Sequence, residues 1–419
     1  MTRKNFAEMI SNQGGRAYLV GGCVRDFYRR VQPKDHDYAV TGLTEKQFTD
    51  LFPEATRVAK SFPVYLLEID GQMSEVAFAR QEWKSGMGYQ GFEFKINPEI
   101  SIEEDLSRRD TTMNAMAIDI LTRDLIDPFN GIAAIMNGYI KAVNDHFCDD
   151  PVRALRAARQ SAQFGYIITH KTIRLMHKCK VELFQEPAER IFKELEKALA
   201  TDKPSLYFRA LAEADILRST YPEVDDLIGV PQPELYHPEG DVFEHTMQVL
   251  DKVSKVTKDV RVRFAALCHD LGKALSPEEE LPHHYKHEFT GLDVLDKISK
   301  SWALPNEWKK SAYVAIKRHM HLPYIKKERK MVPILFDVAK SPIGFSGFNT
   351  IIQADTTDPN GLPVWLEKGE EIMRQLKKVK GTDAPKEVLE TNSKLIGDWI
   401  LGERARILKG IIKHYKEEK

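Results

Sequence analysis

The spacing of apolar residues changes along the chain, and a change near residue 140 separates two kinds of predicted structure. The first part carries short apolar runs bounded by glycine and polar residues, a pattern typical of β-strands. The run Tyr18–Val20 ends in two glycines, and the residues from Val24 onward predict a helix. Further strands are predicted at 35–40, 64–70, 74–79 and 115–121.

Between these strands, residues 80–92 carry Gly86, Gly88 and Gly91 among charged side chains, so this segment is predicted to be a mobile loop. From about residue 141 the strand signals stop, and helical periodicity covers 152–164, 188–199 and 206–214. Three prolines between residues 231 and 238 mark a linker, and a histidine-rich region follows.

These patterns predict an α+β protein whose head has a small mixed sheet with helices and whose remainder is all-α. A chain of 419 residues is too long for one ordinary core, so several domains are expected. We expect a head at 1–140, a helical neck and body at 141–230, a histidine-rich domain at 231–360 and a helical tail at 361–419.

Composition narrows the class of protein. The content of 42% hydrophobic and 29% charged residues is typical of a soluble globular protein, and the net charge of −1 provides no overall basic field for nucleic acid. The four cysteines are far apart, which favours reduced thiols in a cytosol. We find no signal segment and no run of about 18 apolar residues, so a cytoplasmic protein without a membrane partner is expected.

The first candidate site combines a glycine turn with two carboxylates. Gly22 lets a backbone approach a ligand, and Arg25 beside a helix start suits a nucleoside triphosphate. Asp35 and Asp37 are two residues apart in a predicted strand, so both carboxylates would point from one face. Such a pair can hold two Mg²⁺ ions for nucleotidyl transfer. Taken alone, the glycine pair also fits a tight turn, and the two aspartates also fit a solvated acidic loop. Together the two features favour a nucleotidyltransferase.

Two further segments carry arginines. Arg109, after Arg108 and five residues before Asn114, could grip phosphate and ribose, although a solvated charge cluster has the same composition. In the second segment Asp150 precedes a predicted helix with three arginines on one face; the alternative is a helix cap with surface charge. These arginines are Arg153, Arg156 and Arg159.

The series of motifs resembles the class II tRNA nucleotidyltransferases, which include the CCA-adding enzymes and poly(A) polymerase relatives. The resemblance implies that Asp35 and Asp37 bind catalytic Mg²⁺ and that Arg109 contacts the incoming nucleotide. It also implies that Asp150 and Arg153 read the base edge as a protein template for C or A. The chain departs from the family pattern at Asp149, where Glu is common, and at Gln160, where an aromatic residue is common.

The histidine-rich half suggests a second chemistry. His269-Asp270 ends an apolar run and precedes Gly272-Lys273, an arrangement that resembles the HD phosphohydrolase superfamily. By that resemblance His245, His269, Asp270 and Asp355 would hold a divalent transition metal such as Ni²⁺, which would activate water. Other candidates in this half of the chain are His283, His284, His287, His319 and His321.

Both resemblances combine in the family of bacterial multifunctional CCA proteins. This implies an enzyme that adds CCA to the 3′ end of tRNA from CTP and ATP, using Mg²⁺, with a separate phosphohydrolase. A poly(A) polymerase is the alternative enzyme, and an HD hydrolase with a nucleotide-sensing head is an alternative of another class. The sequence leaves open whether the protein is a monomer or a homodimer.

Overall fold

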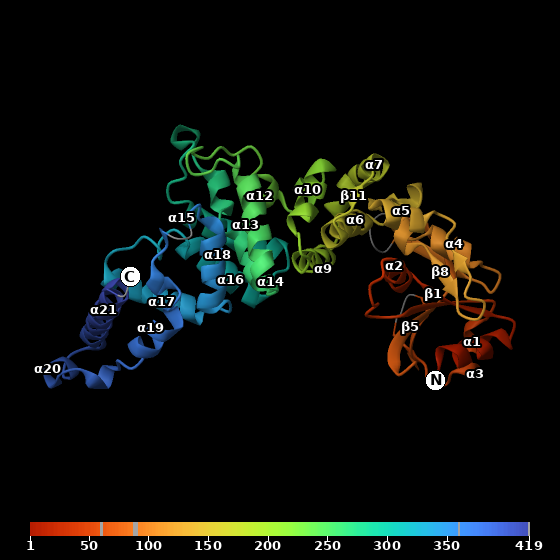
Figure 1. The fold of residues 1–419 in the computed structure, drawn as a ribbon, viewed down its shortest axis with the longest axis horizontal. Coiled ribbons are helices and arrows are strands. Elements are labelled where there is room, and N and C mark those ends of the chain that lie inside the picture. The colour runs from red at the N-terminus through yellow and green to blue at the C-terminus, as the bar shows by residue number, and fades with distance from the viewer. Residues whose placement is uncertain (59–61, 87–90, 359–360, 418–419) are drawn as a thin grey trace. The chain divides into compact units, whose positions relative to one another are not determined.

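The computed structural model describes residues 1–58, 62–86, 91–358 and 361–417. The chain divides into two compact units (Figure 1), one formed by Met1–Glu194 with Leu206–Thr220 and the other by Leu195–Ser205 with Tyr221–Lys419. Among the described residues, we find no helix with the length and apolar character needed to cross a membrane.

The first unit contains a seven-stranded mixed sheet with the strand order β3-β4-β5-β2-β1-β8-β9. Its central strands β2 and β5 are parallel, with Asp37 opposite Glu75, whereas β1 is antiparallel to both β2 and β8. The strands are β1 (Arg16–Val20), β2 (Asp37–Thr41), β3 (Thr56–Arg57), β4 (Val64–Ile69), β5 (Gln72–Phe78), β8 (Ala117–Asp119) and β9 (Leu125–Ile126).

Apolar clusters lie on both faces of this sheet. Phe6 and Phe48, from helices α1 and α3, belong to the cluster that contains Val40, while Val20 and Leu106 belong to a second cluster. Successive side chains of a strand point to opposite faces, so a strand buried on both sides has a continuous apolar run. The helices near the sheet are α1 (Arg3–Ser11), α2 (Gly22–Tyr28), α3 (Glu45–Leu51), α4 (Ile102–Ser107) and α5 (Gly131–Asn137).

Three local predictions were wrong. Strand β2 begins at Asp37, so Asp35 lies in a bend before the strand. Much of the predicted loop at 80–92 is a hairpin of β6 (Arg80–Lys84) and β7 (Phe92–Ile96), since aromatic residues at alternate positions suit strands; Gly88 lies outside the described residues. In the part predicted to be helical, residues 167–168 form a short strand, β11 (Ile167–Ile168), which pairs with β10 (Tyr139–Ile140) at the end of the predicted head.

Helices follow the head, as the apolar periodicity predicts. Between residues 150 and 226 they are α6 (Val152–Phe164), α7 (His170–Lys178), α8 (Lys180–Leu183), α9 (Ala188–Leu199), α10 (Ser205–Glu213), α11 (Leu217–Thr220) and α12 (Pro222–Asp225). Beyond residue 240 they are α13 (Val242–Val256), α14 (Val260–Cys268), α15 (His287–Ser301), α16 (Asn306–Arg318), α17 (Glu328–Lys340), α18 (Gly344–Asp355), α19 (Gly369–Leu376), α20 (Lys386–Leu389) and α21 (Ser393–Glu417).

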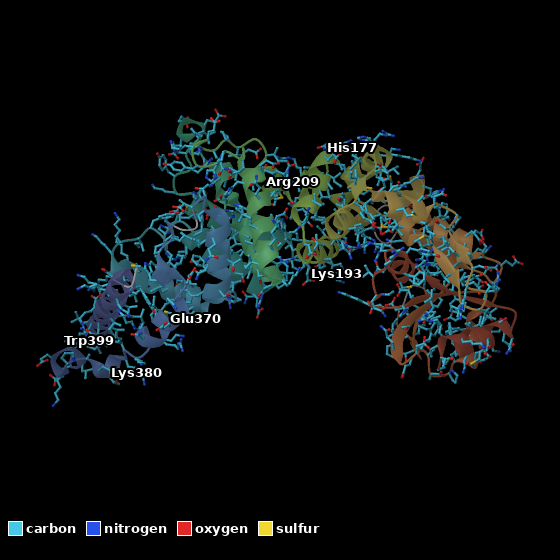
Figure 2. All side chains as sticks on the ribbon, viewed as in Figure 1. His177, Lys193, Arg209, Glu370, Lys380 and Trp399 are labelled. Carbon is cyan, nitrogen blue, oxygen red and sulfur yellow. The ribbon has the colours of Figure 1, made fainter. Side chains whose placement is uncertain are left out.

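Most of the helices beyond residue 240 contribute to one apolar core, namely α13, α14, α16, α17, α18, α19 and α21. It includes Val249 of α13 and Phe348 of α18, and also Met373 of α19 and Leu408 of α21. Exposed Glu370 marks the outer side of α19 in Figure 2. The residues after 360, expected as a separate tail, therefore complete the hydrophobic core of the second unit.

Candidate functional site

A cavity of about 910 Å³ in the first unit collects most of the residues predicted to act on a nucleotide. Of the two predicted catalytic carboxylates, Asp37 lines this cavity, whereas Asp35 is not among its lining residues. All eight predicted nucleotide-binding residues line it: Gly22, Arg25, Arg109, Asn114, Asp150, Arg153, Arg156 and Arg159.

The glycine turn after β1 brings an arginine to the cavity wall. Gly21 has a φ of 72°, and a Cβ atom there would lie 2.8 Å from Nη1 of Arg109. Only glycine accepts both the backbone angle and the close contact without strain. The Nη2 atom of Arg109 donates to Asp105 at 3.1 Å, while its Nε is buried and has no hydrogen-bond partner among the described residues. Arg109 thus keeps a buried donor available for an anion.

A second carboxylate lies beside Asp37 on the neighbouring strand. Glu75 of β5 is the parallel partner of Asp37 in β2 and also lines the cavity. Loss of water around the carboxylate and the negative charge of Glu75 raise the pKa of Asp37. Carboxylate oxygens are the ligands that Mg²⁺ prefers, so this pair suits a cation. Sequence reasoning missed Glu75 because the partner of β2 cannot be identified from local periodicity.

The cavity arginines are held by buried acids. Nε of Arg156 donates to Asp110 at 2.7 Å, and Asn114 and Gln160 donate to the same carboxylate. Burial alone would raise the pKa of Asp110. The charge of Arg156 and these hydrogen bonds instead hold that pKa well below its ordinary value. Gln160 also accepts from Thr111 at 2.8 Å, so it adds hydrogen bonds where an aromatic side chain is common in the resembled family.

Asp150 and Arg153 line the cavity but have separate partners. Both oxygens of Asp150 lie 3.1 Å from Nη2 of Arg190, and Asp150 also accepts from the backbone N–H of Val152. Arg153 donates to the carbonyl oxygen of His146 at 2.8 Å. Neither side chain is therefore bonded to the other, and both have groups facing the cavity.

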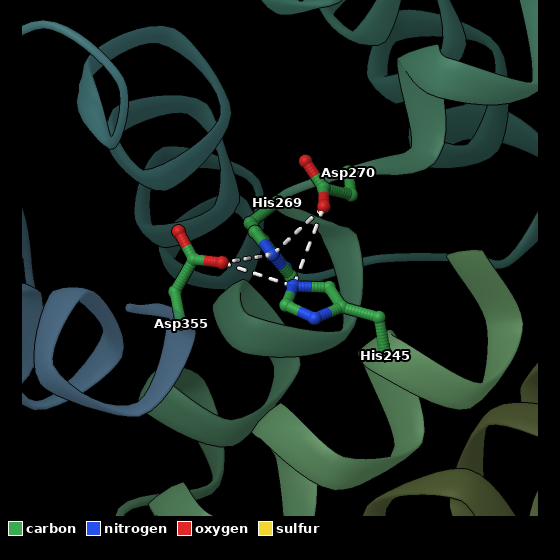
Figure 3. Close-up of side chains that lie close together, drawn as sticks. All are labelled: His245, His269, Asp270 and Asp355. Atoms are coloured by element: carbon green, nitrogen blue, oxygen red, sulfur yellow. Dashed lines mark hydrogen bonds and ion pairs between the residues drawn. The ribbon is translucent and has the colours of Figure 1, made fainter. Parts of the chain in front are cut away.

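Four residues from the histidine-rich half meet in the second unit (Figure 3). His245 lies on α13, His269 and Asp270 follow α14, and Asp355 ends α18. Nε2 of His245 is 2.9 Å from Asp355, and Nε2 of His269 is 3.1 Å from Asp270 and 3.5 Å from Asp355. Their ligand atoms lie within 4.8 Å of one another.

The donor atoms of this cluster fit a divalent cation. Nε2 of His269 and both carboxylate oxygens of Asp270 are buried and make no hydrogen bond of regular geometry in the described part of the chain, apart from ion pairs of Asp270 with Lys273 and His269. Unpaired buried polar atoms are costly, and a metal ion would satisfy them together. Burial alone would lower the pKa of His269. The carboxylates of Asp270 and Asp355 outweigh burial and raise the pKa of His269 to about 10. The cluster thus attracts positive charge strongly.

Two more histidines extend the cluster around Asp270. Nε2 of His287 and Nε2 of His319 are 3.2 Å apart and each lies 3.4 Å from Oδ1 of Asp270. Their Nδ1 atoms face backbone carbonyls and can donate to them, so the Nε2 atoms could serve as ligands of a cation bound beside Asp270. His284 instead bonds Ser276 and the Pro231 carbonyl.

Comparisons with known proteins match three regions of the chain. Three family models match: "Poly A polymerase head domain" at residues 17–141, "Probable RNA and SrmB- binding site of polymerase A" at 165–228 and "HD domain" at 242–344. The chain is 38% identical to the multifunctional CCA protein of Mannheimia succiniciproducens, over 86% of this chain and 88% of that protein. It is 41% identical to that of Shewanella denitrificans, over 73% and 74%.

Solved structures share the fold. The CCA-adding enzyme of Bacillus stearothermophilus in complex with CTP is 21% identical, with a TM-score of 0.67 and coverage of 99% of this chain and 96% of that one. A tRNA nucleotidyltransferase complexed with a primer tRNA and an incoming ATP analogue is 20% identical, with a TM-score of 0.59 and coverage of 89% and 98%.

Proposed function

Because the chain belongs to the family of multifunctional CCA proteins, we propose that it adds and repairs the 3′-terminal CCA of tRNA from CTP and ATP. We propose that a separate metal-dependent phosphohydrolase site lies in its HD domain. The observation that carries the first activity is the single cavity lined by Asp37, Arg109, Asp150 and Arg153. The proposed parts are a head at 1–140, a neck and body at 141–230, an HD domain at 231–360 and a helical tail at 361–419, whose Met373 and Leu408 share the apolar core of the second unit.

In the head, Asp37 and Glu75, which both line the cavity, would hold Mg²⁺, and Asp35 would reach it from the preceding bend. When bound, Mg²⁺ neutralises charge on the phosphates and lowers the pKa of an attacking hydroxyl. The side chains of Arg109 and Arg25 line the cavity and would bind the triphosphate. Asn114, which accepts from Arg25 at 2.8 Å, orients the guanidinium of Arg25.

Base selection in this proposal depends on complementary hydrogen bonds. C and A both present an amino donor beside a ring-nitrogen acceptor, whereas U and G present a carbonyl acceptor beside an N–H donor. A carboxylate at Asp150 and a guanidinium at Arg153 match the first pattern and mismatch the second. A polar site rejects a mismatched ligand strongly because its own buried groups stay unpaired. Arg156 and Arg159 line the same cavity and would bind along the nucleotide.

In the HD domain, the proposed ligands are His245, His269, Asp270 and Asp355, with His287 and His319 adding donors around Asp270. A transition metal such as Ni²⁺ suits imidazole and carboxylate ligands and would lower the pKa of a bound water. Lys273, whose Nζ is 2.7 Å from Asp270, would attract the anionic phosphoester. The expected substrates are 2′,3′-cyclic phosphates, 2′-nucleotides and small phosphoesters. Removing a terminal cyclic phosphate would expose the hydroxyl that the head extends.

The proposal is tested with the purified full chain and tRNAs that lack one, two or all three of their terminal nucleotides. Each tRNA is incubated with Mg²⁺ and a single nucleoside triphosphate, and the products are sequenced. CTP should extend only the ends that need C, and ATP only the end that needs A. Unlimited addition of A would instead indicate a poly(A) polymerase, and no addition would leave a nucleotide-sensing head. Light scattering during the same preparation would distinguish a monomer from a homodimer.

A further inference from the structure

A carboxylate outside the four-residue HD cluster contacts one of its histidines. Glu239 precedes α13, and its Oε1 lies 2.7 Å from Nδ1 of His245. The other ring nitrogen of His245, Nε2, faces Asp355 at 2.9 Å and Asp270 at 3.7 Å. Glu239 therefore contacts the side of the imidazole that points away from the cluster. Glu239 was not among the site residues predicted from the sequence.

The contact decides which nitrogen of His245 carries the proton. An ionised carboxylate only accepts hydrogen bonds, so Nδ1 donates to Glu239, and a cation bound between Nε2 and the carboxylate of Asp355 would take the Nε2 lone pair. His269 is arranged in the same way, because its Nδ1 lies 2.7 Å from the carbonyl oxygen of Ala266. A carboxylate makes its partner imidazole a stronger donor to a metal than a neutral carbonyl does.

We propose that Glu239 is a positioning residue of the metal site, which fixes the tautomer and the ring orientation of His245. This inference rests on the metal-dependent function proposed for the HD domain. The carboxylate is itself held in place, since Nδ1 of His237 lies 3.0 Å from the same oxygen. The His237 ring also packs edge-on against the His245 ring, with centroids 4.7 Å apart. His237 and Glu239 together restrict rotation of His245.

The same three residues could be imagined as a separate metal site, since His237, Glu239 and His245 have potential ligand atoms within 4.8 Å. That arrangement would require Nδ1 of His245 to be unprotonated so that its lone pair binds the ion, and the ring proton would then lie on Nε2, toward the carboxylates of the main cluster. The two arrangements predict different numbers of bound ions, so they can be distinguished by stoichiometry.

The test is titration of Co²⁺ into the full chain, with Asp35→Ala, Asp37→Ala and Glu75→Ala present throughout to remove the proposed ligands of the head. In this background, Glu239→Ala should weaken Co²⁺ binding about 10- to 100-fold. Glu239→Gln should restore most of the affinity, because its amide oxygen can still accept from Nδ1. The matched control is Glu278→Ala, at an exposed position of the same unit, which should bind as tightly as the parent.

A second readout reports the tautomer directly. In ¹⁵N-histidine spectra of the protein loaded with diamagnetic Zn²⁺, with His245 assigned by His245→Gln, the parent should show Nδ1–H together with a metal-bound Nε2. Glu239→Ala should show a mixture of tautomers, whereas a residue that merely supports the fold would leave the spectrum unchanged. If Glu239→Ala does not fold, Glu239→Asp replaces it, since the shorter side chain withdraws the carboxylate from Nδ1 while keeping the charge.

The outcomes separate this inference from the proposed function. A parent protein that binds no Co²⁺ would overturn both. A parent that binds Co²⁺, with unchanged affinity and tautomer in Glu239→Ala, would overturn the positioning role alone. Two ions in the parent and one in Glu239→Ala would show that Glu239 is a ligand, which also contradicts the inference.

Discussion

At the scale of single residues, buried acids decide where the cationic groups of the head lie. Asp105 and Asp110 are almost fully buried, and each is paired with an arginine that lines the nucleotide cavity. Arg109 and Arg156 are therefore held in place before a ligand arrives. Arginines arranged in this way lose little side-chain entropy on binding, so the acids contribute to affinity without touching the nucleotide.

The carboxylate of Asp37 should be essential for nucleotide addition. Asp37→Ala should lower the rate about a thousandfold or more, because stabilisation of charge by a metal ion contributes several kcal/mol. Glu75→Gln should give a smaller loss, since it removes the neighbouring charge but keeps an oxygen. Single-turnover addition of C and A to tRNA measures both. Addition at nearly the normal rate by Asp37→Ala would rule out its assignment.

The pairing of Asp105 should make the stability of the head depend on acid pH. Burial alone would raise the pKa of Asp105, but the charges of Arg108 and Arg109 lower this pKa from 3.8 to about 2. A carboxylate with a lowered pKa contributes stability above the pKa of the unfolded chain, and that contribution is lost as the pH falls through the folded value. The contribution at neutral pH is about 2 kcal/mol.

Asp105→Asn should therefore destabilise the segment 102–114 at pH 5, and the difference from the parent should shrink at pH 3. Hydrogen exchange of peptides from this segment, in the full chain, measures the local opening free energy. Asp124→Asn, at an exposed position of the same unit, is the control and should leave the opening free energy unchanged at both pH values. A difference that stays constant between the two pH values would contradict the pairing.

At the scale of elements, contacts of α9 with α6 and with the residue just before α6 position side chains that line the nucleotide cavity. Arg190 of α9 binds Asp150, which directly precedes α6, and Glu194 of α9 accepts from Arg159 of α6 at 2.5 Å. The second helix thus orients acidic and basic groups of the first. Neither contact could be derived from the periodicity of either helix alone.

Arg190→Ala should therefore impair selectivity although Arg190 is not proposed to read the base. Without its partner, Asp150 gains rotamer freedom, and discrimination of C and A against U and G should fall about tenfold, or about 1.4 kcal/mol. Competition between the four nucleoside triphosphates measures this ratio. Arg190→Lys keeps the charge but not the contact to both oxygens and should restore it only in part. Unchanged selectivity would show that Asp150 needs no such support.

At the scale of the whole molecule, the two proposed chemistries use different residues in different compact units. The carboxylates and arginines of the nucleotide cavity lie in the first unit, and the HD cluster lies in the second. Within the described chain, we find no residue that belongs to both sets. Each activity should therefore be removable without the other.

The double variant His269→Ala with Asp270→Ala should lose metal-dependent phosphodiesterase activity and keep CCA addition within about twofold. Removing these groups eliminates adjacent ligands of the proposed metal, while the head retains every group assigned to nucleotide transfer. Hydrolysis of a 2′,3′-cyclic nucleotide and extension of tRNA are measured on one preparation. A parallel loss of both activities would contradict their independence.

The sequence by itself determined the α+β class, the change to helices after the head and the motifs that converge on the two sites. These are local properties, because the period of apolar residues and the spacing of charged ones follow from neighbouring positions. The tertiary structure decided which distant groups meet. Glu75 joins Asp37 through parallel pairing of β2 and β5, and Glu239 reaches His245 across a helix start. Strand partners and side-chain contacts depend on long-range packing, which no local pattern records.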